Sequence, residues 1–258
     1  RSLHGHDFNF SNSAERDIWR VRKIMELSGI IAYLVALAIT AGIYAVFALG
    51  LNIQWGYTGL FNIGIAGFFC VGAYTSAMIT LPAPTGMYAR YVHQLFGFNL
   101  PFVFGLVGAA LVCGIVAFLI GIPTLRLGED YLAISTLGIA ETFRLIFNNE
   151  KWLANGARGL TGIPQPFHEL VDPKYYNYIY VFIILLMLVL IYFLIERAIR
   201  SPWGRVLRAI REDEVSASMS GKDIFRFKMQ SLIFGAMVMG VGGALFAHNL
   251  KAVSPEIF

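Results

Sequence analysis

Residues 178–195 read YIYVFIILLMLVLIYFLI, a run of eighteen residues without one charged side chain. A helix that crosses a bilayer needs about 20 mainly apolar residues, and several other windows of this chain approach that length. Of the 258 residues, 57% are hydrophobic and only 14% are charged, whereas about a quarter of an average soluble domain is charged. The chain is therefore predicted to be all-α, a polytopic helical bundle integral to a membrane.

Working outward from that run, six apolar helices are predicted. They span roughly residues 28–52, 58–81, 101–122, 131–147, 177–197 and 229–250. Residues 1–27 form a polar segment ahead of the membrane domain, which takes in residues 28–258. Between the fourth and fifth helices, residues 148–176 are polar and rich in Gly and Pro, and a loop of that length is either functional or disordered.

The net charge of +4 is modest, and the basic residues gather beside apolar runs, which indicates membrane topology rather than nucleic-acid binding. One group precedes the first helix and another follows the fifth: Arg16, Arg20, Arg22 and Lys23, then Arg197, Arg200, Arg205, Arg208 and Arg211. Both groups are expected to be cytoplasmic. Two cytoplasmic points must be joined by an even number of membrane crossings, but five predicted helices lie between the two basic groups. Either the helix at 58–81 or the helix at 131–147 is then broken, re-entrant or non-spanning, or one of the basic groups does not mark the cytoplasmic side.

The charged stretch GRVLRAIREDEVSASMSG, residues 204–221, separates the last two apolar runs. At helical spacing one apolar stripe forms from Trp203, Val206, Leu207, Ile210 and Ala217. Arg208 and Glu212 share another face, four residues apart, and are expected to pair. Ser201 is a suitable N-cap before Pro202, and Gly221 is a suitable stop, so one helix of about five turns is predicted over 201–221.

Two interpretations of this helix stay open. A basic amphipathic helix can lie in the lipid headgroups. It can also dock a soluble protein, which the acidic run at 212–214 favours, because three carboxylates are poorly placed against anionic lipid.

The same stretch carries a family resemblance. It resembles the cytoplasmic loop of ABC importer permeases of the branched-chain amino acid class, most closely the LivM-like subunits. Glu214, Ala217 and Gly221 match the Glu-Ala-Ala…Gly coupling motif. Ser216 stands in place of the first Ala, and the polar residues 222–223 follow where the family tends to be apolar. Similar stretches recur at 47–77, 123–149, 155–166 and 242–258, so the resemblance covers about 40–258.

The resemblance implies a translocation subunit, not an enzyme, for neutral or branched-chain amino acids in a bacterial inner membrane. Its implied partners are a homologous second permease, two cytoplasmic ATP-binding subunits, a periplasmic solute-binding protein and membrane lipid. ATP and Mg²⁺ would bind those ATPases, since this sequence has no Gly-rich phosphate loop. The implied ATPase-coupling residues are Arg205, Arg208, Arg211, Glu212, Glu214, Ala217 and Gly221. The family usually continues with further helices, so C-terminal spans are expected to be absent from this sequence.

Three other functions stay open. One is a urea or short-amide importer of the same family, and another is a structural anchor whose charged helix lies on lipid. The third is an ion-coupled secondary transporter or channel without an ATPase. A proton relay needs more than one acid inside the spans, and Glu141 is the single one found there, which disfavours secondary transport.

Glycines punctuate residues 50–72 and alternate with polar side chains. They permit close helix packing, or an interrupted helix whose freed backbone groups line the solute path. Glu141 and Arg144, three residues apart, form either a functional pair in that path or a self-satisfied pair near the surface. The predicted path residues are Asn52, Gly56, Thr58, Gly59, Asn62, Gly64, Glu141 and Arg144.

Residues 155–166 are expected on the periplasmic side, because the next helix leads to the second basic group. Gly159, Thr161 and Gly162 then shape a gate or a binding-protein surface, or belong to a plain loop. His248 is expected to be a packed polar residue. Neither the two cysteines nor the His-Gly-His at 4–6 predicts a metal site, and no catalytic arrangement is found.

Overall fold

The computed structural model describes residues 13–84, 94, 96–127, 129–168, 172 and 175–258, and only the backbone of 13–28, 129 and 130. The predicted His-Gly-His at 4–6 lies outside these residues. The long helices are α1 (Ser13–Leu51), α2 (Ile65–Thr80), α3 (Phe102–Thr124), α4 (Glu129–Asn149), α6 (Tyr176–Arg200) and α9 (Ile224–Leu250). The short elements are η1 (Asn52–Tyr57), α5 (Lys151–Ala154), η3 (Gly156–Arg158), β1 (Leu160–Thr161), α7 (Pro202–Glu212), α8 (Glu214–Met219), β2 (Ala252–Val253) and η5 (Pro255–Ile257).

This architecture confirms the predicted all-α, polytopic membrane fold. Within the described residues, four segments are long and apolar enough to span a bilayer: Gly29–Tyr57, Phe102–Thr124, Tyr176–Arg200 and Ile224–Leu250. Helix α1 begins at Ser13, earlier than predicted, because nothing between that residue and Gly29 interrupts helical geometry. Its 39 residues extend for about 58 Å at 1.5 Å per residue, roughly twice the hydrocarbon thickness of a bilayer.

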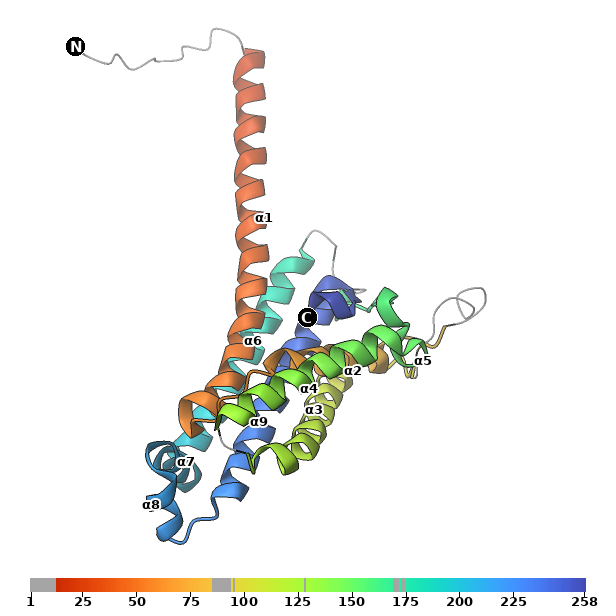
Figure 1. Ribbon diagram of the computed structural model, residues 1–258. Coiled ribbons are helices and arrows are strands. Elements are labelled where there is room, and N and C mark those ends of the chain that lie inside the picture. The colour runs from red at the N-terminus through yellow and green to blue at the C-terminus, as the bar shows by residue number, and fades with distance from the viewer. Residues whose placement is uncertain (1–12, 85–93, 95, 128, 169–171, 173–174) are drawn as a thin grey trace, which may run out of the picture.

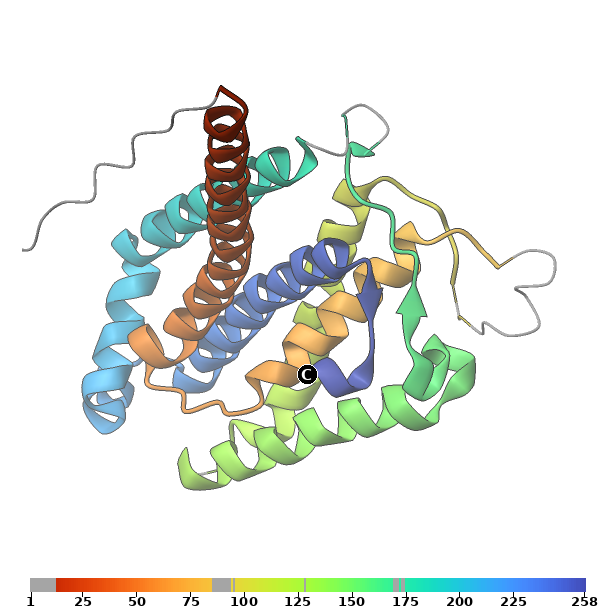
Figure 2. The ribbon, with the colours of Figure 1, turned by 90° about the horizontal axis from the view of Figure 1, so that it is seen from above.

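Successive long helices run in alternating directions between two ends of the bundle (Figures 1 and 2). We call these the α7 end, which holds α7 and α8, and the β end, which holds the antiparallel pair β1–β2. Helices α2 and α4 run the same way, since Gly64 lies against Thr136 and the Tyr74 ring stacks on Phe147 at 4.1 Å.

The alternation bears on the placement of the two basic groups. Helix α1 starts at the end of the molecule away from α7 (Figure 1), and α6 finishes beside α7. The basic residues in the first turns of α1 and those at the end of α6 and in α7 therefore lie at opposite ends of the bundle. This arrangement disagrees with the expectation that both groups face the cytoplasm.

Helix α9 is the centre of the bundle and packs against α1, α2 and α3 (Figure 2). Its contact with α2 depends on glycine. A Cβ on Gly72 would lie 2.3 Å from the carbonyl oxygen of Gly240, and a Cβ on Gly243 would lie 2.1 Å from that of Phe69. Backbones this close pack well in lipid, where small residues allow helices to approach.

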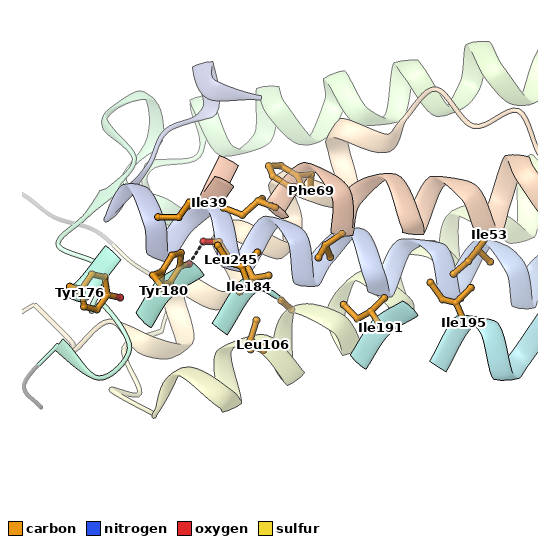
Figure 3. Packing of buried hydrophobic residues seen from close by; sticks show 14 of the residues in the cluster. Ile39, Ile53, Phe69, Leu106, Tyr176, Tyr180, Ile184, Ile191, Ile195 and Leu245 are labelled. Atoms are coloured by element: carbon orange, nitrogen blue, oxygen red, sulfur yellow. Dashed lines mark hydrogen bonds between the residues drawn. The ribbon is translucent and has the colours of Figure 1, made fainter. Parts of the chain in front are cut away.

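One apolar cluster joins α6 to α1 and α9 (Figure 3). Ile184, Ile191 and Ile195 recur at helical spacing on the buried face of α6. Tyr180 extends the same face, and its hydroxyl donates a hydrogen bond of 2.5 Å to the carbonyl oxygen of Leu245. This contact positions α6, and therefore the α7 that follows it, against the centre of the bundle.

Candidate functional site

The charged stretch between α6 and α9 folds into two short helices, α7 and α8, instead of the single helix predicted. The break is at Asp213, whose φ of −158° and ψ of 108° are extended. Its side chain accepts hydrogen bonds from the backbone N–H of Val215 at 2.9 Å and of Ser216 at 3.3 Å, and caps α8. The hydroxyl of Ser216 and these two N–H groups lower the pKa of the Asp213 carboxyl. A capping aspartate thus competes with the continuous helix.

The predicted apolar stripe is confirmed, and it faces the bundle. Leu207 is 0% exposed and Ile210 is 1% exposed. Trp203 stacks edge-on against Phe234 at 5.8 Å, and its indole N–H donates to the side chain of Gln230. The α7–α8 hairpin is therefore attached through its apolar face to α6 and α9.

The predicted Arg208–Glu212 ion pair is wrong. The Arg208 guanidinium instead donates to the carbonyl oxygens of Gly204 and Ile199, each at 3.4 Å. The last carbonyls of a helix such as α6 have no partner inside that helix, so a nearby arginine satisfies them. Ser201 occupies the N-cap position, but its hydroxyl donates to the carbonyl oxygen of Ala198 and does not cap α7.

Helix α8 presents an apolar surface that was not predicted. Val215 is 62% exposed and Met219 is 83% exposed, one turn apart on the same face. The sequence does contain a signal for this surface, because Val215 and Met219 are apolar residues four positions apart that lie outside the main apolar stripe. Glu214 points back to the bundle and pairs with Lys228 of α9. Gly221 ends the hairpin with a φ of +74°, as its predicted stop position requires.

Arg211 connects the hairpin to a distant part of the chain. Its guanidinium donates to the carbonyl oxygen of Gly56 in η1, directly after α1. Gly59, with a φ of +77°, lies under the same side chain, and a Cβ there would be 3.3 Å from Cγ of Arg211. The predicted coupling segment and the predicted path segment are therefore in direct contact.

The interruption expected within 50–72 is present, at residues 52–64. Helix α1 widens into the π-helix η1, and the chain then runs without helical geometry to Gly64. Wide turns of this kind occur often at functional sites. The carbonyl oxygen of Ile53 is satisfied by the hydroxyls of Thr58, at 3.1 Å, and of Ser231, at 3.0 Å.

A buried polar network links this broken segment to α9. Gln54, which is 0% exposed, donates to the carbonyl oxygen of Leu232 at 3.0 Å and accepts from Asn62 at 2.8 Å. Asn62 in turn accepts from the backbone N–H of Gly64. Gln54 is one of the polar side chains that alternate with the glycines of 50–72. Ser231 was not predicted, because sequence alone does not tell which polar side chains of distant helices are buried together.

The predicted path residues thus divide into three sets. Thr58 and Asn62 are buried in the network, while Gly56, Gly59 and Gly64 allow close contacts, Gly64 with Thr136 of α4. Asn52 is exposed and lines an apolar groove of about 560 Å³ between α1 and α6. Glu141 and Arg144 lie apart from both, paired with each other on α4. Whether any of them contacts a solute stays a prediction.

The predicted periplasmic residues lie at the β end and are part of an ordered ribbon. Gly159 has a φ of +64°, and a Cβ there would be 1.9 Å from the carbonyl oxygen of Val253. Thr161 belongs to β1, and the backbone N–H of Gly162 donates to the carbonyl oxygen of Lys251. His248 is buried nearby, bonded to Ser76 at 2.9 Å and to the carbonyl oxygen of Pro164 at 2.8 Å.

The sequence is similar to those of known transport permeases over most of its length. Residues 33–258 match the family model described as branched-chain amino acid transport system / permease component. The high-affinity branched-chain amino acid transport system permease protein LivM of Salmonella typhimurium is 35% identical over 238 residues, which cover 84% of this chain and 52% of that relative. The protein of the same name from Escherichia coli is 34% identical with the same coverage. A probable branched-chain amino acid transport permease protein LivM from Methanocaldococcus jannaschii is 29% identical over 233 residues, 80% of this chain and 64% of the relative.

The chain spans about half the length of the first two relatives. No solved structure matches it. The family match and the four apolar helices of spanning length confirm the predicted multi-pass inner-membrane location. Since the match takes in residues 33–258, this chain belongs to the family of permease components of branched-chain amino acid transport systems.

Proposed function

We propose that the chain is the permease subunit of an ATP-driven importer for branched-chain amino acids, and that the α7–α8 hairpin is its contact with a separate ATPase. The substrate class is carried over from the names of the relatives. The α7 end is then cytoplasmic and the β end periplasmic. A second permease and a solute-binding protein complete the importer in this proposal, and ATP and Mg²⁺ bind the ATPase subunits.

One observation carries the docking function. An amphipathic helix that lies on lipid inserts its apolar face between the headgroups. Here that face, built on Leu207 and Ile210, is buried against the bundle and is not available to lipid. The hairpin instead presents Val215 and Met219, beside exposed charged residues. An apolar centre within a polar rim is the usual composition of a protein interface.

The contacts of the hairpin supply a route for coupling. Movement of α7 would act on the broken segment through Arg211 and Gly56, and movement of α8 would act on α9 through Glu214 and Lys228. A coupled transition requires contacts that differ between states. A π-helix next to a segment without helical geometry is the part of α1 best suited to change.

Co-purification tests this proposal. The natural chain is isolated from native membranes in mild detergent beside a Val215→Asp, Met219→Asp variant, whose changes face away from the bundle. The ATP-binding subunit is expected to travel with the natural chain and to be lost from the variant, while thermal unfolding of the variant stays unchanged. If the natural chain purifies with lipid alone, the docking proposal is contradicted. The hairpin would then be interpreted as a structural anchor that lies on lipid. Ion-driven flux through such a chain would then indicate a secondary transporter.

A further inference from the structure

A second polar feature of the described residues is the Glu141–Arg144 pair of α4. Arg144 holds Glu141 through two parallel hydrogen bonds, from Nε to Oε2 at 2.8 Å and from Nη2 to Oε1 at 2.5 Å. Glu141 lies twelve residues after the start of α4 and eight before its end. At 1.5 Å per residue it is about 18 Å and 12 Å from the two ends. The pair therefore lies near the middle of α4, away from both of its ends.

Inside a bilayer, charged side chains face protein or water, because exposure to hydrocarbon costs several kcal/mol. The side chains of Glu141 and Arg144 are 50% and 36% exposed, so the pair is not enclosed by this chain. It borders a cavity of about 110 Å³ between α4, the start of α2 and the C-terminal Phe258. That volume has room for several water molecules, which need only about 10–15 Å³ each by this measure, and it opens toward the exposed side of the pair.

The remaining wall of the cavity is apolar. It is formed by Ile63, Ala66, Leu137, Ala140 and Phe258 together with Gly67 and Cys70. A site with one carboxylate, one guanidinium and an aliphatic wall is complementary to a neutral zwitterion with an aliphatic side chain. A cation or an anion would be repelled by one member of the pair, and Arg144 uses only two of its five N–H groups on Glu141.

We infer that Glu141 and Arg144 bind the α-ammonium and α-carboxylate groups of an amino acid as it passes along the water-facing side of α4, with its side chain against Ile63 and Leu137. This inference rests on the proposed function and adds the groups that recognise the solute. Ile63 belongs to the segment that Arg211 contacts through Gly56, and its backbone N–H donates to Thr136 of α4 at 3.2 Å. Solute binding and the hairpin would therefore act on the same broken segment.

Thiol labelling tests the water-facing side. The complete importer is reconstituted in liposomes, with Cys70 and Cys113 replaced by alanine and a single cysteine introduced by Leu137→Cys. Leu137 is 53% exposed at the cavity, and Leu186→Cys, 57% exposed on α6, is the matched control. A charged methanethiosulfonate is expected to label the first position and not the second, and L-leucine is expected to slow that labelling. Equal labelling at both positions would overturn the inference.

Charge variants test recognition. Adding Arg144→Gln to Leu137→Cys should abolish protection by L-leucine. The exchange Glu141→Arg, Arg144→Glu keeps an ion pair, so a purely structural pair would leave uptake unchanged. We expect L-leucine uptake at saturation to fall at least about tenfold, the worth of one charge-assisted hydrogen bond, with assembly of the importer retained. Natural uptake by the exchanged pair overturns this inference alone. If the natural importer shows no ATP-driven uptake, the proposed function itself fails.

Discussion

Arg211 of α7 and Gly56 of η1 are joined by a hydrogen bond from guanidinium to backbone carbonyl oxygen, although 155 residues separate them in the chain. The carbonyl belongs to a wide helical turn, where backbone groups lose their regular partners. An arginine from another element therefore completes the hydrogen bonding of the broken helix. The same arginine belongs to the hairpin proposed to contact the ATPase.

Arg211→Ala is expected to uncouple ATP hydrolysis from uptake without releasing the ATPase. Loss of this exposed hydrogen bond costs about 1 kcal/mol, because water can replace the lost donor, so uptake per ATP hydrolysed should fall roughly fivefold. Arg226→Ala is the matched control, since Arg226 is an exposed arginine of α9 outside the predicted coupling residues. Equal uptake by the two variants would show that the contact with Gly56 carries no coupling.

A comparison of Gly59→Ala with Gly162→Ala distinguishes the effect of backbone strain from that of a steric contact with Arg211. Alanine at a φ of +77° is strained, and its Cβ would lie 3.3 Å from Cγ of Arg211. Gly162 has a similar φ of +80° but open space around it, so Gly162→Ala carries the strain alone. Each change should lower the free energy of unfolding by roughly 1–2 kcal/mol. Thermal unfolding in detergent measures that loss, and only Gly59→Ala should also reduce uptake.

The cap of α8 predicts a pH dependence. The hydrogen bonds from Ser216 and Val215 hold the pKa of Asp213 below its usual value. A carboxyl with a lowered pKa in the folded state contributes stability above its unfolded pKa, and this contribution is lost as pH falls through the folded pKa. The protection of the N–H groups of Val215 and Ser216, measured as exchange relative to the intrinsic rate at each pH, should therefore persist at neutral pH and fall only in acid, below about pH 4. Asp213→Ala should lack this protection at both pH values, and a variant that stays protected would contradict the cap.

Much of the fold could be predicted from sequence, because lipid requires long apolar segments whose ends are marked by polar residues. The stripe on α7 and the stop at Gly221 were predicted because both depend on local spacing. The orientation of α1 was not. The positive-inside rule counts charges near spans, and the long helical extension from Ser13 places its basic residues away from the α7 end.

The contacts of the candidate site could be predicted only in part. Residues 52–64 contain the glycines and amides that indicate a broken helix, and the structure confirms the break. The partners of that segment include Thr136 of α4 and, more than 150 residues later, Ser231, Leu232 and Arg211. No local pattern encodes such pairs. The division of 201–221 into two helices depends on one aspartate that caps α8 in preference to continuing α7.

Gln54 supports the broken segment and provides the last prediction. Its amide bridges Leu232 of α9 and Asn62, and it is 0% exposed. Gln54→Leu roughly keeps the size of the side chain but leaves the side-chain N–H of buried Asn62 without its acceptor, at about 1–3 kcal/mol. Leu232 lies inside α9, so its carbonyl keeps its intrahelical partner. The free energy of unfolding should fall by roughly 1–3 kcal/mol, and amide exchange should quicken around residue 232. Asn52→Leu, at an exposed position on the same π-helix, should change stability little. Equal losses in the two variants would mean that the network does not hold η1 to α9.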